Sequence, residues 1–238
     1  MKVFGSVAAA YAEHRPDYPA DAVRWVLAAA PGVRVLDLGA GTGKLTAALL
    51  QVGASVTAVE PDPAMRAVLD ETFPQVQTLP GSAESIAVPD ATVDAIVAGN
   101  AMHWFDMTAA EPEFTRVLAP GGVTAGLWNV LDDSVGWVAE LARVAGAAVV
   151  GPRDTPDAWR AATAGMLGAA AQARAFPHGQ RRTADSLVAT LATRAGVLIM
   201  PEPQRAMLLA RIRDFLASRP ETATGEFTLP MLTMVLRR

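Results

Sequence analysis

The sequence predicts an α/β fold in which a doubly wound, mostly parallel sheet is covered by helices on both faces. Two observations predict it. Short apolar runs alternate with helix-like segments through the first 129 residues, and this alternation is typical of parallel sheets. The runs, such as VRVLDL and VDAIVAG, are continuously apolar, as strands buried on both faces require.

Local signals place the elements of the sheet. Pro31-Gly32 and Gly53 end the first two expected helices. Asp62 is a plausible N-cap for the third, because Pro63 follows at the first helical position. The capping-box spacing of Thr108 and Glu111 predicts that a fourth begins at Thr108. The expected helices cover 20–30, 44–52, 62–72 and 108–119, and the expected strands cover 33–38, 55–59, 76–79, 93–98 and 123–129.

Beyond residue 129 the sequence becomes Ala-rich and helical. We expect helices over 136–150, 157–174 and 183–193. A further helix is predicted because Leu208, Leu209, Ile212, Phe215 and Leu216 recur at helical spacing and share one face. Residues 226–237 are β-like and are expected to return to the sheet.

Composition argues against several classes of protein. The chain has 238 residues, no cysteine and a formal net charge of −4. It therefore has no disulfide and no thiol nucleophile, and nucleic-acid or membrane partners are not expected. The three histidines, His14, His103 and His178, are far apart and give a metal site little support. The absence of cysteine and the early charged residues fit a cytoplasmic protein better than a secreted one.

The stretch VLDLGAGTGKL, residues 35–45, carries three glycines at alternate positions. A P-loop would need glycine at position 38 and serine or threonine at 45, but both are leucine. A dinucleotide-binding loop would need a third glycine at Lys44. The loop therefore fits neither a nucleoside triphosphate nor a dinucleotide.

Two acids flank this loop in the expected fold. Asp37 precedes the first glycine by two residues, where a carboxylate would repel a pyrophosphate and suit an ammonium group. Glu60 ends the second expected strand, at the spacing where a carboxylate accepts hydrogen bonds from ribose hydroxyls. S-adenosylmethionine has matching groups: an amino acid, a sulfonium and an adenosine.

These residues resemble the first motif of the class I S-adenosylmethionine-dependent methyltransferases, which have a Rossmann-like fold. VEPDPAM (59–65) resembles the family's second motif. Three further stretches resemble the subset that includes trans-aconitate methyltransferase: YAEHRPDYP near the N-terminus, GSAESIAVPDATVDAIVAGNAMHWFD (81–106) and FTRVLAPGGVTAGLWN (114–129). The resemblance implies one domain, 1–238, with an N-terminal helical lid (1–31), a cofactor-binding core (32–130), and a helical cap with terminal strands (131–238).

The resemblance also implies roles for individual residues. Asp37 and the loop after it would hold the methionine part of the cofactor, Glu60 the ribose, and Pro61 and Met65 the adenine. Arg15, in the lid, is able to meet a carboxylate. The full set implied for S-adenosylmethionine is Tyr11, Arg15, Asp37, Gly39, Ala40, Gly41, Thr42, Gly43, Glu60, Pro61, Met65, Ser82, Ala83, Glu84, Asn100 and Ala101.

Methyl transfer from a sulfonium is an in-line displacement, so the protein mainly positions the acceptor and deprotonates it where needed. His103 is the candidate general base, with a structural role as its alternative. Trp104 and Trp128 are further substrate-contact candidates, with core packing as their alternative.

The acceptor is less constrained than the cofactor. The Asn/Asp-Pro-Pro-Tyr motif that marks transfer to amino nitrogens in the family is absent after the fourth expected strand. Together with the acidic charge, this favours a small-molecule acceptor, with oxygen as the first expectation. A non-catalytic protein that binds the same cofactor is the alternative, and a homodimer is possible.

Overall fold

The computed structural model describes residues 15–151 and 153–238. Seven strands of these residues form one sheet. Four short strands make up one half of it: β1 (Arg34–Leu38), β2 (Ser55–Val59), β3 (Gln77–Leu79) and β4 (Val93–Gly99). Three longer strands make up the other half: β5 (Leu118–Leu131), β6 (Gln172–Arg182) and β7 (Phe227–Arg237).

The strand order is β3-β2-β1-β4-β5-β7-β6. Neighbouring strands from β3 to β5 run parallel, whereas β7 is antiparallel to both β5 and β6. The doubly wound, mostly parallel sheet that the sequence predicts is therefore confirmed, and β7 is the expected C-terminal return.

Four helices accompany the parallel strands: α2 (Ala20–Leu27), α3 (Lys44–Gln51), α4 (Pro63–Thr72) and α5 (Met107–Val117). Alternate residues of β1 face opposite sides of the sheet. Val35 belongs to a core that includes Val23 of α2 and Leu49 of α3, whereas Leu36 belongs to a core that includes Phe114 of α5. Both faces of the sheet are therefore covered, which explains why its strands are apolar throughout.

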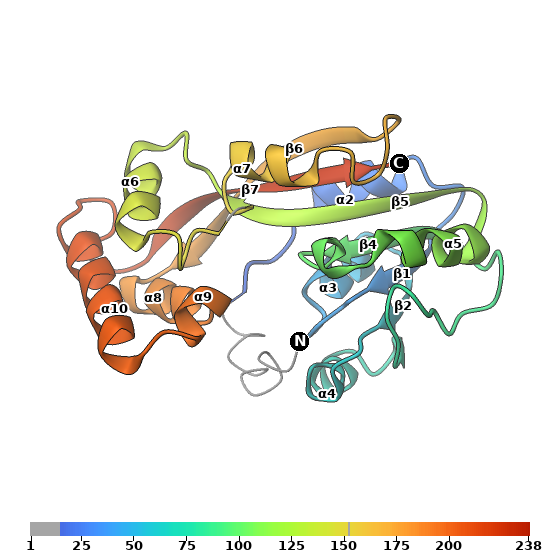
Figure 1. The fold of residues 1–238 in the computed structure, drawn as a ribbon, viewed down its shortest axis with the longest axis horizontal. Helices are drawn as coiled ribbons and strands as arrows, with labels where there is room; N and C mark the ends of the chain where they lie inside the picture. The colour runs from blue at the N-terminus through green and yellow to red at the C-terminus, as the bar shows by residue number, and fades with distance from the viewer. Residues whose placement is uncertain (1–14, 152) are drawn as a thin grey trace.

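Five more helices follow β5: α6 (Gly136–Ala145), α7 (Pro156–Thr163), α8 (Ala184–Ala192), α9 (Ala195–Leu198) and α10 (Glu202–Ala217). Figure 1 shows α6, α8, α9 and α10 gathered at the far end of β5, β6 and β7, away from β1 and β2; we call these four helices the cap. Their apolar faces form a separate core, in which Leu208, Ile212 and Leu216 of α10 are buried. Among the described residues, no helix has the length and apolarity needed to cross a membrane.

The helix expected over 157–174 is wrong in its second half. α7 stops at Thr163, and residues from Gln172 onward belong to β6. Gly165 and Gly168 both adopt a left-handed backbone, each with φ 76°, and this conformation ends a right-handed helix. The Ala-rich composition therefore outweighed the two glycines in the sequence interpretation.

Smaller differences occur at other boundaries. α6 ends at Ala145, before Gly146, rather than at 150. The N-cap of α5 is Asp106, whose carboxylate accepts a hydrogen bond from the N–H of Thr108 at 3.0 Å. β5 begins at Leu118, so that the expected breaker Pro120-Gly121-Gly122 lies within the strand. Of the expected N-terminal lid, residues 1–14 lie outside the described residues.

A buried asparagine ties the beginning of the described chain to the sheet. The Nδ2 of Asn129, on β5, donates to the carbonyls of Pro16 at 3.3 Å and Asp17 at 3.1 Å. Its Oδ1 accepts from the hydroxyl of Thr233, on β7, at 2.6 Å. One side chain therefore connects the segment before α2 with two of the long strands.

We expect Asn129→Ala to lower the free energy of unfolding by about 1–3 kcal/mol, because it leaves buried polar groups without partners. Denaturant titration measures the change. Gln204→Ala, at an exposed position of α10, is the control and should change stability by less than about 0.5 kcal/mol. An equal effect of the two substitutions would show that the hydrogen bonds of Asn129 do not stabilise the fold.

Candidate active site

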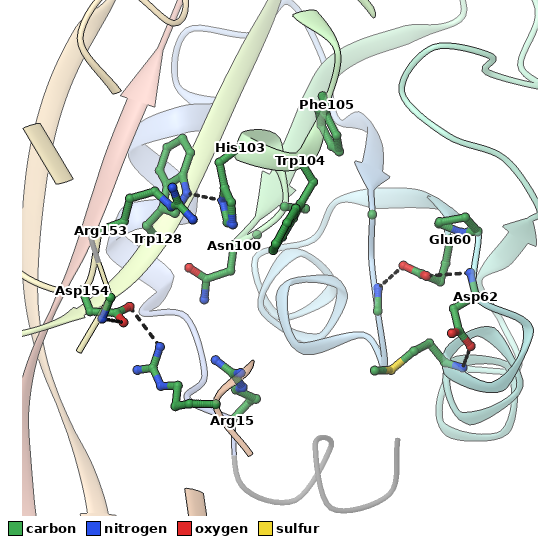
Figure 2. A pocket seen from close by; sticks show the side chains of 18 of the residues that line it. Arg15, Glu60, Asp62, Asn100, His103, Trp104, Phe105, Trp128, Arg153 and Asp154 are labelled. Carbon is green, nitrogen blue, oxygen red and sulfur yellow. Dashed lines mark hydrogen bonds and ion pairs between the residues drawn. The ribbon is translucent and has the colours of Figure 1, made fainter. Parts of the chain in front are cut away.

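A cavity of about 420 Å³ lies where β1, β2 and β4 end and extends to the cap. Crevices at the carboxyl ends of parallel strands are the usual ligand sites of open α/β sheets. Figure 2 shows Glu60 and Asp62 at one end of this cavity, and His103, Trp128 and Arg153 at the other. We call these the sheet end and the cap end.

Most of the residues that the sequence assigns to a cofactor meet at this place. The main cavity is lined by Arg15, Gly39, Gly41, Glu60, Pro61, Met65, Ser82, Ala83, Glu84, Asn100 and Ala101. A smaller adjoining cavity of about 40 Å³ is lined by Asp37, Ala40 and Thr42 as well as by Arg15, Gly39, Gly41 and Asn100. Gly43 lines neither cavity and precedes α3, and Tyr11 lies outside the described residues.

The loop after β1 turns sharply into α3 through glycines. Gly39 has φ 70°, and a Cβ there would lie 2.8 Å from the Cβ of Ala101. Gly41 has φ 59°, and a Cβ there would meet no atom within 4 Å. The first glycine is therefore required by close packing, whereas the second presents open backbone to the cavity, where a ligand can approach it.

Asp37, on β1, is fully buried. Its Oδ2 accepts a hydrogen bond from the hydroxyl of Thr46 at 2.6 Å, and its Oδ1 has no partner among the described residues. Burial is the main cause that raises the pKa of Asp37 to about 7, and the charge of Glu60 adds to it. A buried carboxyl oxygen without a partner beside a cavity is a place where a ligand can supply the missing donor.

Glu60 follows β2 and is also buried. Its Oε2 accepts from the N–H of Gly41 at 2.9 Å, and its Oε1 accepts from the N–H of Asp62 at 2.8 Å. Burial raises the pKa of Glu60 in spite of these two hydrogen bonds. Because a carboxylate has about four acceptor sites, both oxygens can still accept from ligand hydroxyls.

The opposite wall comes from the segments that follow β3 and β4. The Oε1 of Glu84 accepts from the N–H of Asp106 at 2.9 Å, which holds the two loops together. Asn100 follows β4 in a left-handed conformation with φ 49°. Strained backbone of this kind clusters at functional sites, and Asn100 lines both cavities.

His103 lies in a short 3₁₀ helix, Met102–Trp104, at the cap end. Its Nδ1 accepts a hydrogen bond from the Nε1–H of Trp128 at 3.1 Å. Burial, with a smaller contribution from the charge of Arg153, lowers the pKa of His103 to about 4. The ring is therefore neutral at physiological pH and carries its proton on Nε2. This arrangement favours a hydrogen-bond donor over the general base that the sequence suggests.

The two tryptophans that the sequence singles out both line the cavity. Trp104 is 60% exposed, and its ring centroid lies 5.0 Å from that of His103. Trp128 is buried and packs against Trp159, with ring centroids 5.8 Å apart. Trp128 therefore combines core packing with a place in the site.

The cap end includes residues that the sequence interpretation missed. They are Ala147, Ala148, Val149, Gly151, Arg153, Asp154, Arg194 and Gly196. A Cβ at Gly196 would lie 2.4 Å from the carbonyl oxygen of Ala148, so α9 contacts this loop backbone to backbone. The sequence did offer one sign of this part of the site: Arg153 and Asp154 follow Gly151 in the segment between two expected helices.

Comparisons with known proteins identify methyltransferases as relatives of this chain. The methyltransferase domain family matches residues 36–126. An uncharacterised methyltransferase of Mycobacterium tuberculosis is 39% identical over 235 residues, which cover 98% of this chain and 94% of the relative. The solved structure of a putative type II methyltransferase from Anaeromyxobacter dehalogenans is 26% identical, with a TM-score of 0.73 and coverage of 94% and 97%. Demethylmenaquinone methyltransferase of Chlorobaculum tepidum is 35% identical over 91 residues, which cover 37% of this chain and 38% of that protein.

The fold is that of a class I methyltransferase. With a relative at 39% identity over nearly the whole of both chains, the protein belongs to the S-adenosylmethionine-dependent methyltransferase family and is an enzyme of that family.

The raised pKa of Asp37 makes stability depend on pH. The folded-state pKa of about 7 lies above the ordinary 3.8, so the stabilisation from the bound proton is complete at low pH and is lost as pH rises toward 7. A difference of one in pKa between the folded and unfolded states corresponds to roughly 1.4 kcal/mol of folding free energy. As pH rises from about 4 to about 7, the free energy of unfolding of Asp37→Asn should increase by several kcal/mol relative to that of the parent protein. Denaturant titration at each pH measures this difference. Asp157→Asn, at an exposed position of α7, should show no such gain.

Proposed function

We propose that this enzyme uses S-adenosylmethionine to methylate a small-molecule acceptor at oxygen. The observation that carries the proposal is the pairing of two buried acids at one cavity. Asp37 offers a carboxyl oxygen that has no donor among the described residues, and Glu60 offers acceptor sites at the cavity wall. When bound, S-adenosylmethionine supplies an electrophilic methyl group and a good leaving group.

The residues present fit the parts of that cofactor. In our proposal Asp37 accepts from the ammonium group, and Arg15 meets the carboxylate. Glu60 accepts from the ribose hydroxyls, while Pro61 and Met65 pack against the adenine.

The other residues assigned to the cofactor would shape the walls of its site. We propose that Gly39, Ala40, Gly41, Thr42 and Gly43 form the wall around the methionine part.

We also propose that Ser82, Ala83 and Glu84 face the adenine edge, and that Asn100 and Ala101 border the amino-acid end.

The space at the cap end favours an enzyme with a bound acceptor over a non-catalytic protein that binds the cofactor alone. The cavity continues from Asn100 to His103 and the cap loop, and no bulky side chain of the described residues fills that space. The loop after α6 and Gly196 of α9 line it. A cavity of this size suits a small molecule, as does the partial match to a methyltransferase that acts on demethylmenaquinone. An oxygen already ionised at neutral pH suits it best, because such an acceptor needs no base.

Calorimetric titration with S-adenosylhomocysteine and, separately, NADH tests the cofactor assignment. We expect micromolar binding of S-adenosylhomocysteine only. Glu60→Gln and Asp37→Asn should each weaken it about tenfold or more, because each removes an acceptor for a ligand donor. Glu71→Gln, at an exposed position of α4, is the control. Binding of NADH instead would overturn the proposal, and transfer of a labelled methyl group then identifies acceptors.

A further inference from the structure

At the cap end of the cavity, one arginine forms no ion pair with the part of the chain that the structure describes. Arg194 and Asp154 neutralise each other through an ion pair at 2.9 Å, in which both side chains are 18% exposed. Arg153 lines the same cavity, and no carboxylate of residues 15–151 or 153–238 pairs with it. An arginine held at a cavity without an acidic partner is a site for an anionic group of a ligand.

A neutral donor stands beside this arginine. Because Trp128 donates to the Nδ1 of His103, the remaining ring proton is on Nε2. Figure 2 shows the side chain of Arg153 directed toward the pair formed by Trp128 and His103. Arg153 and His103 line the same cavity, and the charge of Arg153 contributes to the lowered pKa of His103.

The rest of the cap end is apolar. Ala147, Ala148 and Val149 line one side, and the indole of Trp104 lies at the exposed rim. Such walls bury flat or aliphatic surface well. At this end of the cavity, a ligand with a charged group and an apolar body therefore matches both kinds of surface.

We propose that Arg153 and the Nε2–H of His103 form a subsite for a single carboxylate, carried by an acceptor whose body is flat and apolar. Trp128 is the positioning residue of this subsite, because its indole N–H determines which nitrogen of His103 is the donor. The proposal deepens the proposed function in taking the bound anion to be part of the methyl acceptor.

The test compares benzoate with benzamide, which have nearly the same shape but differ in charge. Both are titrated calorimetrically into the full chain, with and without saturating S-adenosylhomocysteine. We expect benzoate to bind at least about tenfold more tightly than benzamide, as a charge-assisted hydrogen bond predicts. Arg153→Gln should remove that preference. Arg160→Gln, which removes an exposed arginine of α7 paired with Asp157, should keep it.

The two proposals can fail separately. If S-adenosylhomocysteine binds but benzoate has no advantage over benzamide, or keeps it in Arg153→Gln, the carboxylate subsite is wrong and the methyltransferase assignment stands. If benzoate shows the expected dependence on Arg153 but S-adenosylhomocysteine does not bind, the cofactor assignment is wrong and the subsite stands.

Nitrogen NMR of the His103 ring tests the positioning role of Trp128 and needs no activity assay. We expect a neutral ring protonated on Nε2 between about pH 5.5 and about pH 8. Trp128→Phe should produce a mixture of tautomers and weaken benzoate binding, whereas a Trp104→Phe control should keep the tautomer. A ring protonated on Nδ1, or a tautomer unchanged in Trp128→Phe, would overturn the role of Trp128.

Discussion

The register of β1 against its two neighbours is the constraint on which the site depends. Leu38 pairs with Val59 of β2, and Asp37 pairs with Val97 of β4, so three strands end at nearly the same level. The alignment continues past the strand, because the N–H of Gly39 donates to the carbonyl of Val59 at 2.8 Å. A slip of one residue would move Asp37 to the other face of the sheet, and its carboxyl group would no longer reach the glycine loop.

The sheet end of the cavity could be predicted from sequence because its chemistry is local to strand ends. Once β1 and β2 are recognised as buried parallel strands, topology places Asp37 and Glu60 at one edge. The cap end depends instead on contacts between distant segments, such as Arg194 with Asp154, and a single sequence carries little sign of these. The Ala-rich composition added to the difficulty, because residues 172–174 were expected to be helical and instead begin β6.

The two ends of the cavity are built in different ways. At the sheet end, backbone N–H groups hold Glu60, and the same strands that make the fold make the site. At the cap end, Asp154 holds the wall together, because Oδ1 binds Arg194 and Oδ2 accepts from the N–H of Gly151 at 2.7 Å. His103 illustrates the same difference. Its position after β4 was visible in the sequence, but which ring nitrogen carries the proton follows from Trp128, 25 residues farther along the chain.

The contact between Gly196 and Ala148 has a consequence for how the enzyme can diversify. The backbones touch there, so position 196 tolerates no side chain without displacing the loop. Ala147 and Val149, which flank Ala148, line the same wall with small side chains, and larger or polar residues there would reshape this end of the cavity. The lining of the cap end can therefore change at a few loop positions during evolution, while the strand ends that hold Asp37 and Glu60 stay untouched.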